Sequence, residues 1–251
     1  MPYAHSSPLE KLDVYPSASP NSPLVVWVHG GAWAGGDKSL GPSNKAAELQ
    51  SSGITVFEIN YRLDSHKLSA FPMEIQDVNL ATKWAIANAA SFNANPAKVT
   101  QLGSSAGGHL VAMSSQDLNN KRKGTVGGLV TLSGPFDFVS LVQDGLNGTL
   151  RSTFAPQVGQ ALGCPLSSCT NSVETEWSPS DHVTATNCPP AGWLMYNSSN
   201  ELVPVDQPNA MTAALQQQNC KVTTTIFTGT EHAGAYWEAV KADVAAFINS
   251  E

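Results

Sequence analysis

The stretch VTQLGSSAGGHLVAMSSQ, residues 99–116, passes from a short apolar and β-branched run directly into a longer segment with helical spacing. Its first residues, Val99–Leu102, predict a buried strand, and Ala106–Gln116 predicts an α-helix. The glycines and serines between them leave room only for a tight turn. A strand that enters a helix in this way is typical of a parallel sheet with helices packed on its faces.

The turn itself carries a motif. The pattern G-x-S-x-G fits only the frame Gly103–Gly107, because a frame centred on Ser104 would need glycine at position 102, which is leucine. This frame selects Ser105, and a strand-to-helix turn raises such a serine hydroxyl above the end of the sheet. Glycines two residues to either side let neighbouring backbone approach the turn. Ser105 is therefore the candidate nucleophile.

The rest of the chain repeats the alternation of strands and helices. Apolar runs predict five further strands, at Leu24–Val28, Ile54–Asn60, Gly128–Leu132, Gly192–Tyr196 and Val222–Phe227. Helical spacing predicts four further helices, near Lys38–Ser51, Met73–Ala90, Asp206–Gln218 and Tyr236–Asn249. This order predicts one α/β domain over residues 1–251, with a mostly parallel central sheet and helices on both faces. Residues 135–190, rich in Gly, Ser, Asn and Pro, are expected to form an insertion over the carboxyl edge of the sheet.

Composition and charge limit the classes of partner. The 251 residues are 41% hydrophobic and 13% charged. No apolar run reaches the roughly 18 residues that a spanning helix needs, so we expect a soluble globular protein with no membrane partner. The formal net charge is −7, and the one basic cluster, residues 121–123, suits a solvated loop. We therefore expect no nucleic-acid partner, and a monomer or weak homodimer.

A second glycine-rich motif follows the strand predicted at residues 24–28. Residues 29–33 read HGGAW, and small consecutive residues let the chain curl so that the N–H groups of Gly31 and Ala32 face one point. Together with the N–H of Ala106, at the start of the next predicted helix, they are the candidate oxyanion hole. A phosphate-binding loop is disfavoured, because neither G-x-G-x-x-G nor G-x-x-x-x-G-K-S/T can be laid over this segment.

These motifs, with the pair Tyr61-Arg62 and the segment FPMEIQDVNLATKWAIANAASF at residues 71–92, resemble the α/β-hydrolase superfamily. Over residues 10–249 the chain resembles the microbial carboxylesterases allied to hormone-sensitive lipase. HGGAW is also similar to the motif of feruloyl and acetyl esterases and of kynurenine formamidases. The resemblance implies a catalytic triad in the chain order serine, acid, histidine, an ester substrate, and no metal or organic cofactor.

The implied order points to His232 as the base. It stands in the loop after the last predicted strand and before a helix, which is where the family keeps its catalytic histidine. His109 lies one helical turn past Ser105 and is expected to be a packing residue. His182 is expected to be a structural residue of the insertion, and His29 to shape the oxyanion loop.

The acid departs from the family pattern. Family members carry an aspartate four residues before the proline of a Val-Pro pair, and in YNSSNELVPVDQ, residues 196–207, that position is Asn200. Asparagine can orient an imidazole but supplies no charge. The adjacent Glu201 could reach inward after a small shift of its loop, and Asp137 stands where some lipases place their acid. We favour Glu201 and keep Asn200 and Asp137 as alternatives.

The four cysteines show no C-x-x-C spacing and no neighbouring histidine cluster, which argues against zinc. We expect two disulfides, Cys164–Cys169 and Cys188–Cys220, a choice among three possible pairings. Disulfides fit an exported protein. Residues 1–20 lack the basic and apolar regions of a signal peptide, so either a signal has been removed before Met1 or the chain is cytosolic with reduced thiols.

The expected function is that of a serine hydrolase, which cleaves small-molecule short-chain or aromatic carboxylic esters through an acyl-enzyme. The insertion has few large apolar side chains with which to line a lipid groove. We expect Trp33, Trp177 and Phe136 to flank an aromatic or sugar ester. Two alternatives stay open: amide hydrolysis of an arylformamide, and a binding protein of the same fold without catalysis.

Overall fold

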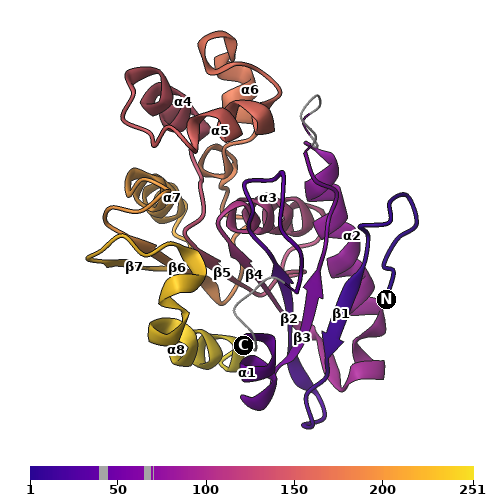
Figure 1. Ribbon diagram of the computed structural model, residues 1–251. Helices are drawn as coiled ribbons and strands as arrows, with labels where there is room; N and C mark the ends of the chain where they lie inside the picture. Colours follow the sequence, from indigo (N-terminus) through magenta and orange to yellow (C-terminus); the bar gives the residue numbers. More distant parts are fainter. Residues whose placement is uncertain (40–44, 65–68, 70) are drawn as a thin grey trace.

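Seven strands form one sheet in the order β1-β3-β2-β4-β5-β6-β7, with helices on both faces (Figure 1). The computed structural model describes residues 1–39, 45–64, 69 and 71–251. The strands are β1 (Leu12–Tyr15), β2 (Ser22–Val28), β3 (Thr55–Ile59), β4 (Ala94–Ser104), β5 (Gly128–Leu132), β6 (Gly192–Ser198) and β7 (Val222–Phe227). β1 runs antiparallel to β3, and the other five pairings are parallel. The prediction of a mostly parallel α/β sheet is confirmed.

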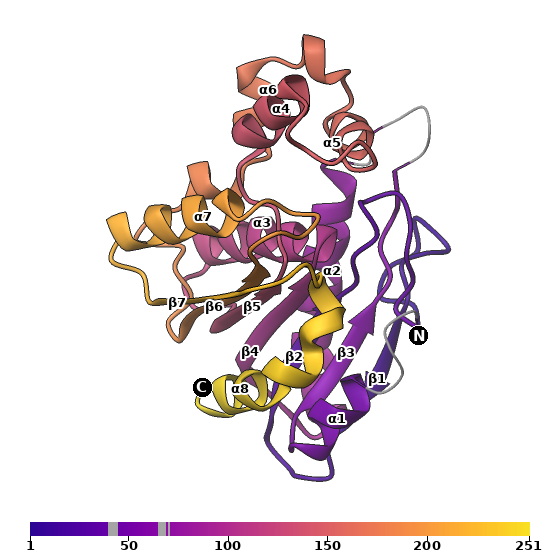
Figure 2. The ribbon, with the colours of Figure 1, turned by 60° about the vertical axis from the view of Figure 1, so that its left-hand side comes forward.

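Two layers of helices cover this sheet (Figures 1 and 2). On one face lie α2 (Met73–Asn88), α3 (Ala106–Lys121) and α7 (Asp206–Gln217), and on the other lie α1 (Lys45–Ser51) and α8 (Trp237–Asn249). Single 3-10 turns occupy Ala89–Phe92, Leu166–Ser168, Pro179–His182 and Ala233–Tyr236. Alternating side chains of the fully buried strand β2 serve both layers, since Val26 packs into the first core and Trp27 into the second.

Residues 135–190, which we call the cap, lie between β5 and β6 and contain α4 (Phe138–Asn147), α5 (Ala155–Leu162) and α6 (Asn171–Glu176). The three helices gather beyond the carboxyl ends of the parallel strands (Figures 1 and 2). Two cap aromatics, Phe138 and Phe154, pack on the ring of Trp33 at centroid distances of 5.6 and 6.3 Å. The cap therefore rests on the loop that follows β2.

Both expected disulfides are present. Cys164 and Cys169 close a short loop of the cap, with their Cα atoms 5.3 Å apart. Cys188 and Cys220, with Cα atoms 5.7 Å apart, join the segments that lead into β6 and β7. Because β6 and β7 are neighbours in the sheet, the second bridge ties these two strands together at their amino ends.

Some element boundaries differ from the predictions. The helix expected from Lys38 begins at Lys45, residues 38–39 form a turn, and residues 40–44 lie outside the described residues. β1 is not among the predicted strands, because only the first of its four side chains is buried and no periodic pattern results. The cap helices are not among the predicted helices, because glycines and asparagines interrupt their short apolar faces.

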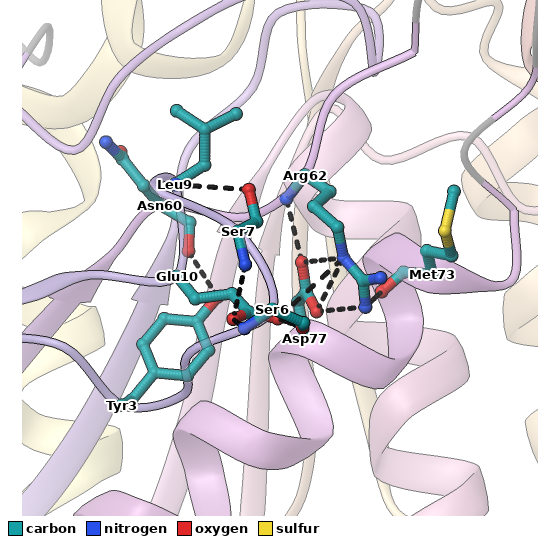
Figure 3. Close-up of polar contacts among 9 residues, drawn as sticks. All are labelled: Tyr3, Ser6, Ser7, Leu9, Glu10, Asn60, Arg62, Met73 and Asp77. Atoms are coloured by element: carbon teal, nitrogen blue, oxygen red, sulfur yellow. Dashed lines mark hydrogen bonds and ion pairs between the residues drawn. The ribbon is translucent and has the colours of Figure 1, made fainter.

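The residues after β3 tie the N-terminal segment to α2 (Figure 3). The guanidinium of Arg62 donates to both carboxylate oxygens of Asp77, at 2.5 Å from Nη2 and 2.9 Å from Nε. The buried carboxylate of Glu10 accepts the backbone N–H groups of Ser6 and Ser7 and lies 3.9 Å from the Arg62 Nε. This buried cluster fixes the start of α2 against the edge of the sheet.

Candidate active site

The sequence-predicted site residues lie at one edge of the sheet. Gly31 and Ala32 follow β2, Ser105 follows β4, Glu201 follows β6, and His232 follows β7. These strands are parallel and belong to one continuous sheet, so their carboxyl ends share an edge. In open α/β sheets this edge is where ligands bind.

Ser105 occupies a strained turn between β4 and α3. Its backbone angles are φ 53° and ψ −123°, outside the regions that residues with a side chain favour. The Ser105 N–H donates to the Leu132 carbonyl of β5 at 2.7 Å, and the Ser105 carbonyl accepts the Gly108 N–H at 2.8 Å. The strained conformation is thus held from both sides, and the residue stays partly exposed.

The two glycines of the motif are needed for close backbone approach. A Cβ atom on Gly103 would lie 2.2 Å from the carbonyl oxygen of Gly107. A Cβ atom on Gly107 would lie 2.2 Å from the carbonyl oxygen of Val28, at the end of β2. Both distances are shorter than any real contact, so no larger residue fits either position without moving the turn.

The loop after β2 lies directly against this turn. A Cβ atom on Gly30 would come within 3.0 Å of the Ser105 Cβ atom. Gly31 and Ala32 both have positive φ, 126° and 50°, and the loop curls accordingly. Ala106 is the first residue of α3, where N–H groups have no intrahelical acceptor. The three candidate oxyanion donors therefore belong to two backbone segments that are packed together.

Trp33 anchors this loop in the core. Its side chain is fully buried, and its indole N–H donates to Nδ1 of His109 at 3.2 Å. His109 Nε2 in turn donates to the Trp177 carbonyl of the cap at 2.9 Å. Burial lowers the pKa of His109 to about 3, so the ring is neutral. His109 is a core residue, as the sequence predicts, and it joins the loop, α3 and the cap.

His29 stabilises the backbone of the same loop. Its Nδ1 donates to the Gly30 carbonyl at 2.7 Å, and its ring stacks on Tyr61 with centroids 4.4 Å apart. The Tyr61 hydroxyl donates to the His29 carbonyl at 2.9 Å. Burial lowers the pKa of His29. His182, in contrast, donates from Nε2 to the Glu176 carbonyl within the cap.

Glu201 and His232 form a hydrogen-bonded pair. Nδ1 of His232 donates to Oε2 of Glu201. Oε1 of Glu201 accepts the backbone N–H of Ser198 at 2.7 Å and the hydroxyl of Ser133 at 2.9 Å. The Glu201 side chain is 0% exposed and that of His232 is 28% exposed. Because a carboxylate only accepts, the neutral imidazole carries its proton on Nδ1, and Nε2 has a free lone pair.

The two alternative acids lie elsewhere. Asn200 is exposed, and its main chain accounts for its contacts: its N–H donates to the Gly229 carbonyl and its carbonyl accepts from Arg151. Asp137 caps the N-terminus of α4, where its carboxylate accepts the Ser140 N–H at 3.1 Å. The structure therefore brings Glu201, and neither alternative, to His232.

The expectation for two of the aromatic residues is wrong. Trp33 is 0% exposed and Phe136 is 1% exposed, so neither can flank a substrate. Both pack into the core, Trp33 on the cap aromatics and Phe136 on the ring of Trp193. Trp177 is partly exposed.

Sequence reasoning missed two residues that contact the Glu201 and His232 segments. Ser133 follows β5 and reaches Glu201, and Tyr236, four residues after His232, reaches Ser133 at 2.6 Å. No motif marks either residue, because the contacts of Ser133 with Glu201 and Tyr236 join segments that are 68 and 103 positions apart in the chain. The one available signal is that Ser133 ends a buried strand at the same sheet edge.

In the part of the chain that the structure describes, no three His, Cys, Asp or Glu side chains gather in a way that could hold a metal ion. The helices of this part also include none with the length and apolar character needed to cross a bilayer.

Comparison with known sequences finds esterases among the proteins that this chain resembles. The BD-FAE family model matches residues 12–215. Acetylcholinesterase from Myxine glutinosa is 31% identical over 163 residues, which cover 60% of this chain and 45% of that protein. The probable carboxylic ester hydrolase LipM from Mycobacterium tuberculosis is 26% identical over 204 residues, which cover 78% of this chain and 45% of that protein. The chain thus spans less than half the length of these curated relatives.

Solved structures show the same fold at lower identity. A truncated form of a carbohydrate esterase from gut microbiota superposes with a TM-score of 0.79 at 20% identity, covering 100% of this chain and 94% of that one. An arylesterase superposes with a TM-score of 0.78 at 21% identity, covering 95% of this chain and 80% of that one.

Proposed function

This chain belongs to the BD-FAE family, and from that premise we propose that it is a serine esterase that hydrolyses carboxylic esters of small molecules. Its mostly parallel sheet has the α/β-hydrolase fold of the esterase structures that it resembles. Carboxylesterases also stand among its sequence relatives, which agrees with this activity.

One observation supports the proposal most strongly. The buried Glu201 carboxylate binds Nδ1 of His232, at the same sheet edge where Ser105 sits in a strained turn against Gly30. A buried acid, a histidine with free Nε2 and a serine on a strand-to-helix turn are the parts that a serine nucleophile requires. We therefore assign Ser105 as nucleophile, His232 as general base and Glu201 as the acid of the triad.

The reaction follows from these assignments. The Ser105 hydroxyl oxygen forms a bond to the ester carbonyl carbon while Nε2 of His232 takes the hydroxyl proton. The N–H groups of Gly31, Ala32 and Ala106 stabilise the oxyanion of the tetrahedral intermediate.

The intermediate then collapses and the alcohol leaves with the proton that His232 held. Water attacks the acyl-enzyme by the same route, its proton passing to His232. The bond between the acyl carbon and Ser105 Oγ then breaks, Ser105 takes that proton back from His232, and the carboxylic acid is released. Throughout, Glu201 holds the ring in the tautomer with Nδ1 protonated and balances the charge of the imidazolium.

The cap favours a short acyl chain. Its large apolar side chains, such as Phe138 and Phe154, are buried against the core. Within the described part of the cap, Leu146 is the one large hydrophobic side chain that is well exposed, at 52%. A long acyl chain needs an apolar groove, and such a surface does not supply one. Among the solved structures that the chain resembles, a carbohydrate esterase and an acetyl ester-xyloside bifunctional hydrolase make small acetyl esters the first class to assay.

The test is hydrolysis of p-nitrophenyl acetate and butyrate by the wild-type chain and its variants. Ser105→Ala and His232→Ala should abolish turnover, while the matched control Ser104→Ala keeps it within a few-fold. Full turnover by Ser105→Ala would overturn the assignment. Faster cleavage of an arylformamide than of either ester would make the chain an amidase, and no turnover of any substrate would leave a binding protein.

We further propose that the chain works in an oxidising compartment, as a monomer or weak homodimer. The two disulfides support this location, since such bonds persist where thiols are not kept reduced. Peptide mapping without reductant of the natural protein should find both bridges, and free thiols would contradict the proposal. Light scattering with sedimentation measures the oligomeric state.

A further inference from the structure

Ser133 stands between the segments that carry Glu201 and His232. Ser133 is 0% exposed and directly follows β5. Its Oγ atom lies 2.9 Å from Oε1 of Glu201 and accepts the backbone N–H of Ala233 at 2.8 Å. Ala233 is the residue after His232, so one hydroxyl contacts both the proposed acid and the chain that carries the proposed base.

The direction of this hydroxyl follows from a count of protons. The carboxylate of Glu201 only accepts, so the Ser133 proton points at Glu201. The phenol of Tyr236 lies 2.6 Å from Ser133 Oγ, and its one proton is also within reach of the Tyr196 carbonyl oxygen, at 2.9 Å. Burial raises the pKa of Tyr236, so the phenol keeps its proton at any working pH. The Ser133 proton therefore serves Glu201, and the Tyr236 phenol lies against the same hydroxyl.

The backbone conformation of Ser133 indicates that its side chain has a role. Its φ angle is 57°, in the left-handed region where serine is uncommon and glycine is comfortable. The Ser133 N–H donates to the Tyr196 carbonyl at 2.8 Å, which fixes this conformation between β5 and β6. A glycine would make the same backbone bond without strain, but it would leave Glu201 and the Ala233 N–H without their hydroxyl partner.

We propose that Ser133 is a positioning residue of the esterase site, whose hydroxyl holds the Glu201 carboxylate and the His232 loop at the separation that proton transfer requires. This inference rests on the proposed function. Three donors hold the Glu201 carboxylate, and the Ser133 hydroxyl is the one that also accepts the Ala233 N–H of the opposite loop. Its loss leaves the carboxylate free to turn away from the imidazole.

The experiment compares Ser133→Ala, Ser133→Gly and a matched control, Ser114→Ala. Ser114 is a fully buried serine of α3 with two side-chain hydrogen bonds, to Gln101 and Asn79, nine residues past Ser105. Each variant is measured for kcat and KM on p-nitrophenyl acetate and for its melting temperature. Both Ser133 variants should lose about 10- to 100-fold in kcat, the range for losing a hydrogen bond to a charged group, with KM within about three-fold.

The glycine variant separates positioning from folding. It relieves the positive φ strain, so its melting temperature should fall less than that of Ser133→Ala, while its kcat stays equally low. Ser114→Ala should lower the melting temperature and keep kcat within about two-fold. Wild-type kcat in either Ser133 variant would overturn the proposal, and so would an equal kcat loss in Ser114→Ala.

A proton NMR measurement keeps the test independent of esterase activity. The Nδ1–H proton of His232, bound to Glu201, should give a low-field signal in the wild type that disappears in His232→Ala. That signal should shift or broaden in Ser133→Ala and remain in Ser114→Ala. If the wild type hydrolyses no ester, the proposed function fails, and an unchanged signal in Ser133→Ala would separately refute the positioning role.

Discussion

Replacing Glu201 by glutamine keeps the size of the side chain and exchanges one carboxylate oxygen for an NH₂ group. In the structure Oε1 faces the Ser198 N–H and the Ser133 hydroxyl, while Oε2 faces Nδ1–H of His232. An amide nitrogen at the Oε1 position would set two N–H groups against each other, because the Ser198 backbone cannot turn away. At the Oε2 position it instead donates to His232, which must then move its proton from Nδ1 to Nε2.

The second placement is the one we expect, because an imidazole can change tautomer and a backbone amide cannot. It leaves His232 unable to accept the Ser105 proton and removes the charge that stabilises the imidazolium. In serine proteases the equivalent change lowers kcat by about 10⁴-fold. We expect Glu201→Gln to lower kcat by about 10³- to 10⁴-fold, equal to about 4 to 5.5 kcal/mol of transition-state stabilisation. KM should stay within a few-fold, because Glu201 is fully buried behind His232.

The assay is the initial rate on p-nitrophenyl acetate at neutral pH, with circular dichroism and thermal melting as checks on the fold. Asn200→Ala and Asp137→Asn are the controls, since Asn200 binds through its main chain and Asp137 caps α4. Both should keep kcat within about ten-fold. A Glu201→Gln enzyme with kcat within ten-fold of wild type would refute the role of Glu201. Loss of activity in Asp137→Asn with an intact fold would place the acid after β5 instead.

Three further predictions concern Gly30, His109 and the two disulfides. Gly30→Ala should lower kcat more than ten-fold, because its Cβ would lie 2.8 Å from the Ser104 carbonyl oxygen. Gly35→Ala should be tolerated, because its Cβ would meet nothing closer than 3.7 Å. Equal effects of the two substitutions would contradict this reasoning. Burial lowers the pKa of His109 to about 3, so unfolding binds an extra proton and the free energy of unfolding should fall as pH drops from about 6.5 toward 3. His109→Gln should flatten that slope in denaturant titrations, and an unchanged slope would refute it. Removing the Cys188–Cys220 disulfide, which closes a loop of 32 residues, should lower the unfolding free energy by about 4 kcal/mol. Removing Cys164–Cys169, which closes a loop of 5, should lower it by about 2 kcal/mol. The reverse order would count against loop entropy as the cause.

The parts of the site that sequence predicts are those encoded within one short segment. At Ser105, a strand, small residues and a helix follow one another within a few positions. At Gly31, a strand and small residues are followed by a curled loop. Glycines at 103 and 107 are required by backbone atoms only 2.2 Å from where a Cβ would lie, so the motif itself reports the packing. For the same reason β2, β5 and β6 were predictable, since each is a short buried run.

The local sequence pattern alone could not decide which residue is the acid of the proposed triad. Asn200 and Glu201 are adjacent, and which of them turns inward depends on how the loop after β6 is held. The structure holds it through the Asn200 main chain, bound to Gly229 and to Arg151 of the cap, and this leaves Glu201 facing the core. Those partners lie 29 and 49 positions away along the chain, so a rule based on local spacing cannot predict these contacts.

Ser133 and β1 were missed for related reasons. The side-chain contacts of Ser133 are with Glu201, Ala233 and Tyr236, all at least 68 positions further along the chain. β1 is an edge strand with one buried residue, Leu12, and it is defined by its pairing with β3 more than by its own composition. In both cases tertiary contacts, and not local propensity, decide the structure.

The most direct test of the account is the site of covalent modification by a fluorophosphonate that mimics the tetrahedral intermediate. We predict one adduct per chain, mapped by peptide mass spectrometry to Ser105, and no adduct in Ser105→Ala. The adduct should form with the wild-type protein and slow sharply in His232→Ala, because the serine needs its base. An adduct on Ser104 or any other residue, or a protein that the reagent leaves unmodified, would contradict the central claim that this turn carries a nucleophile.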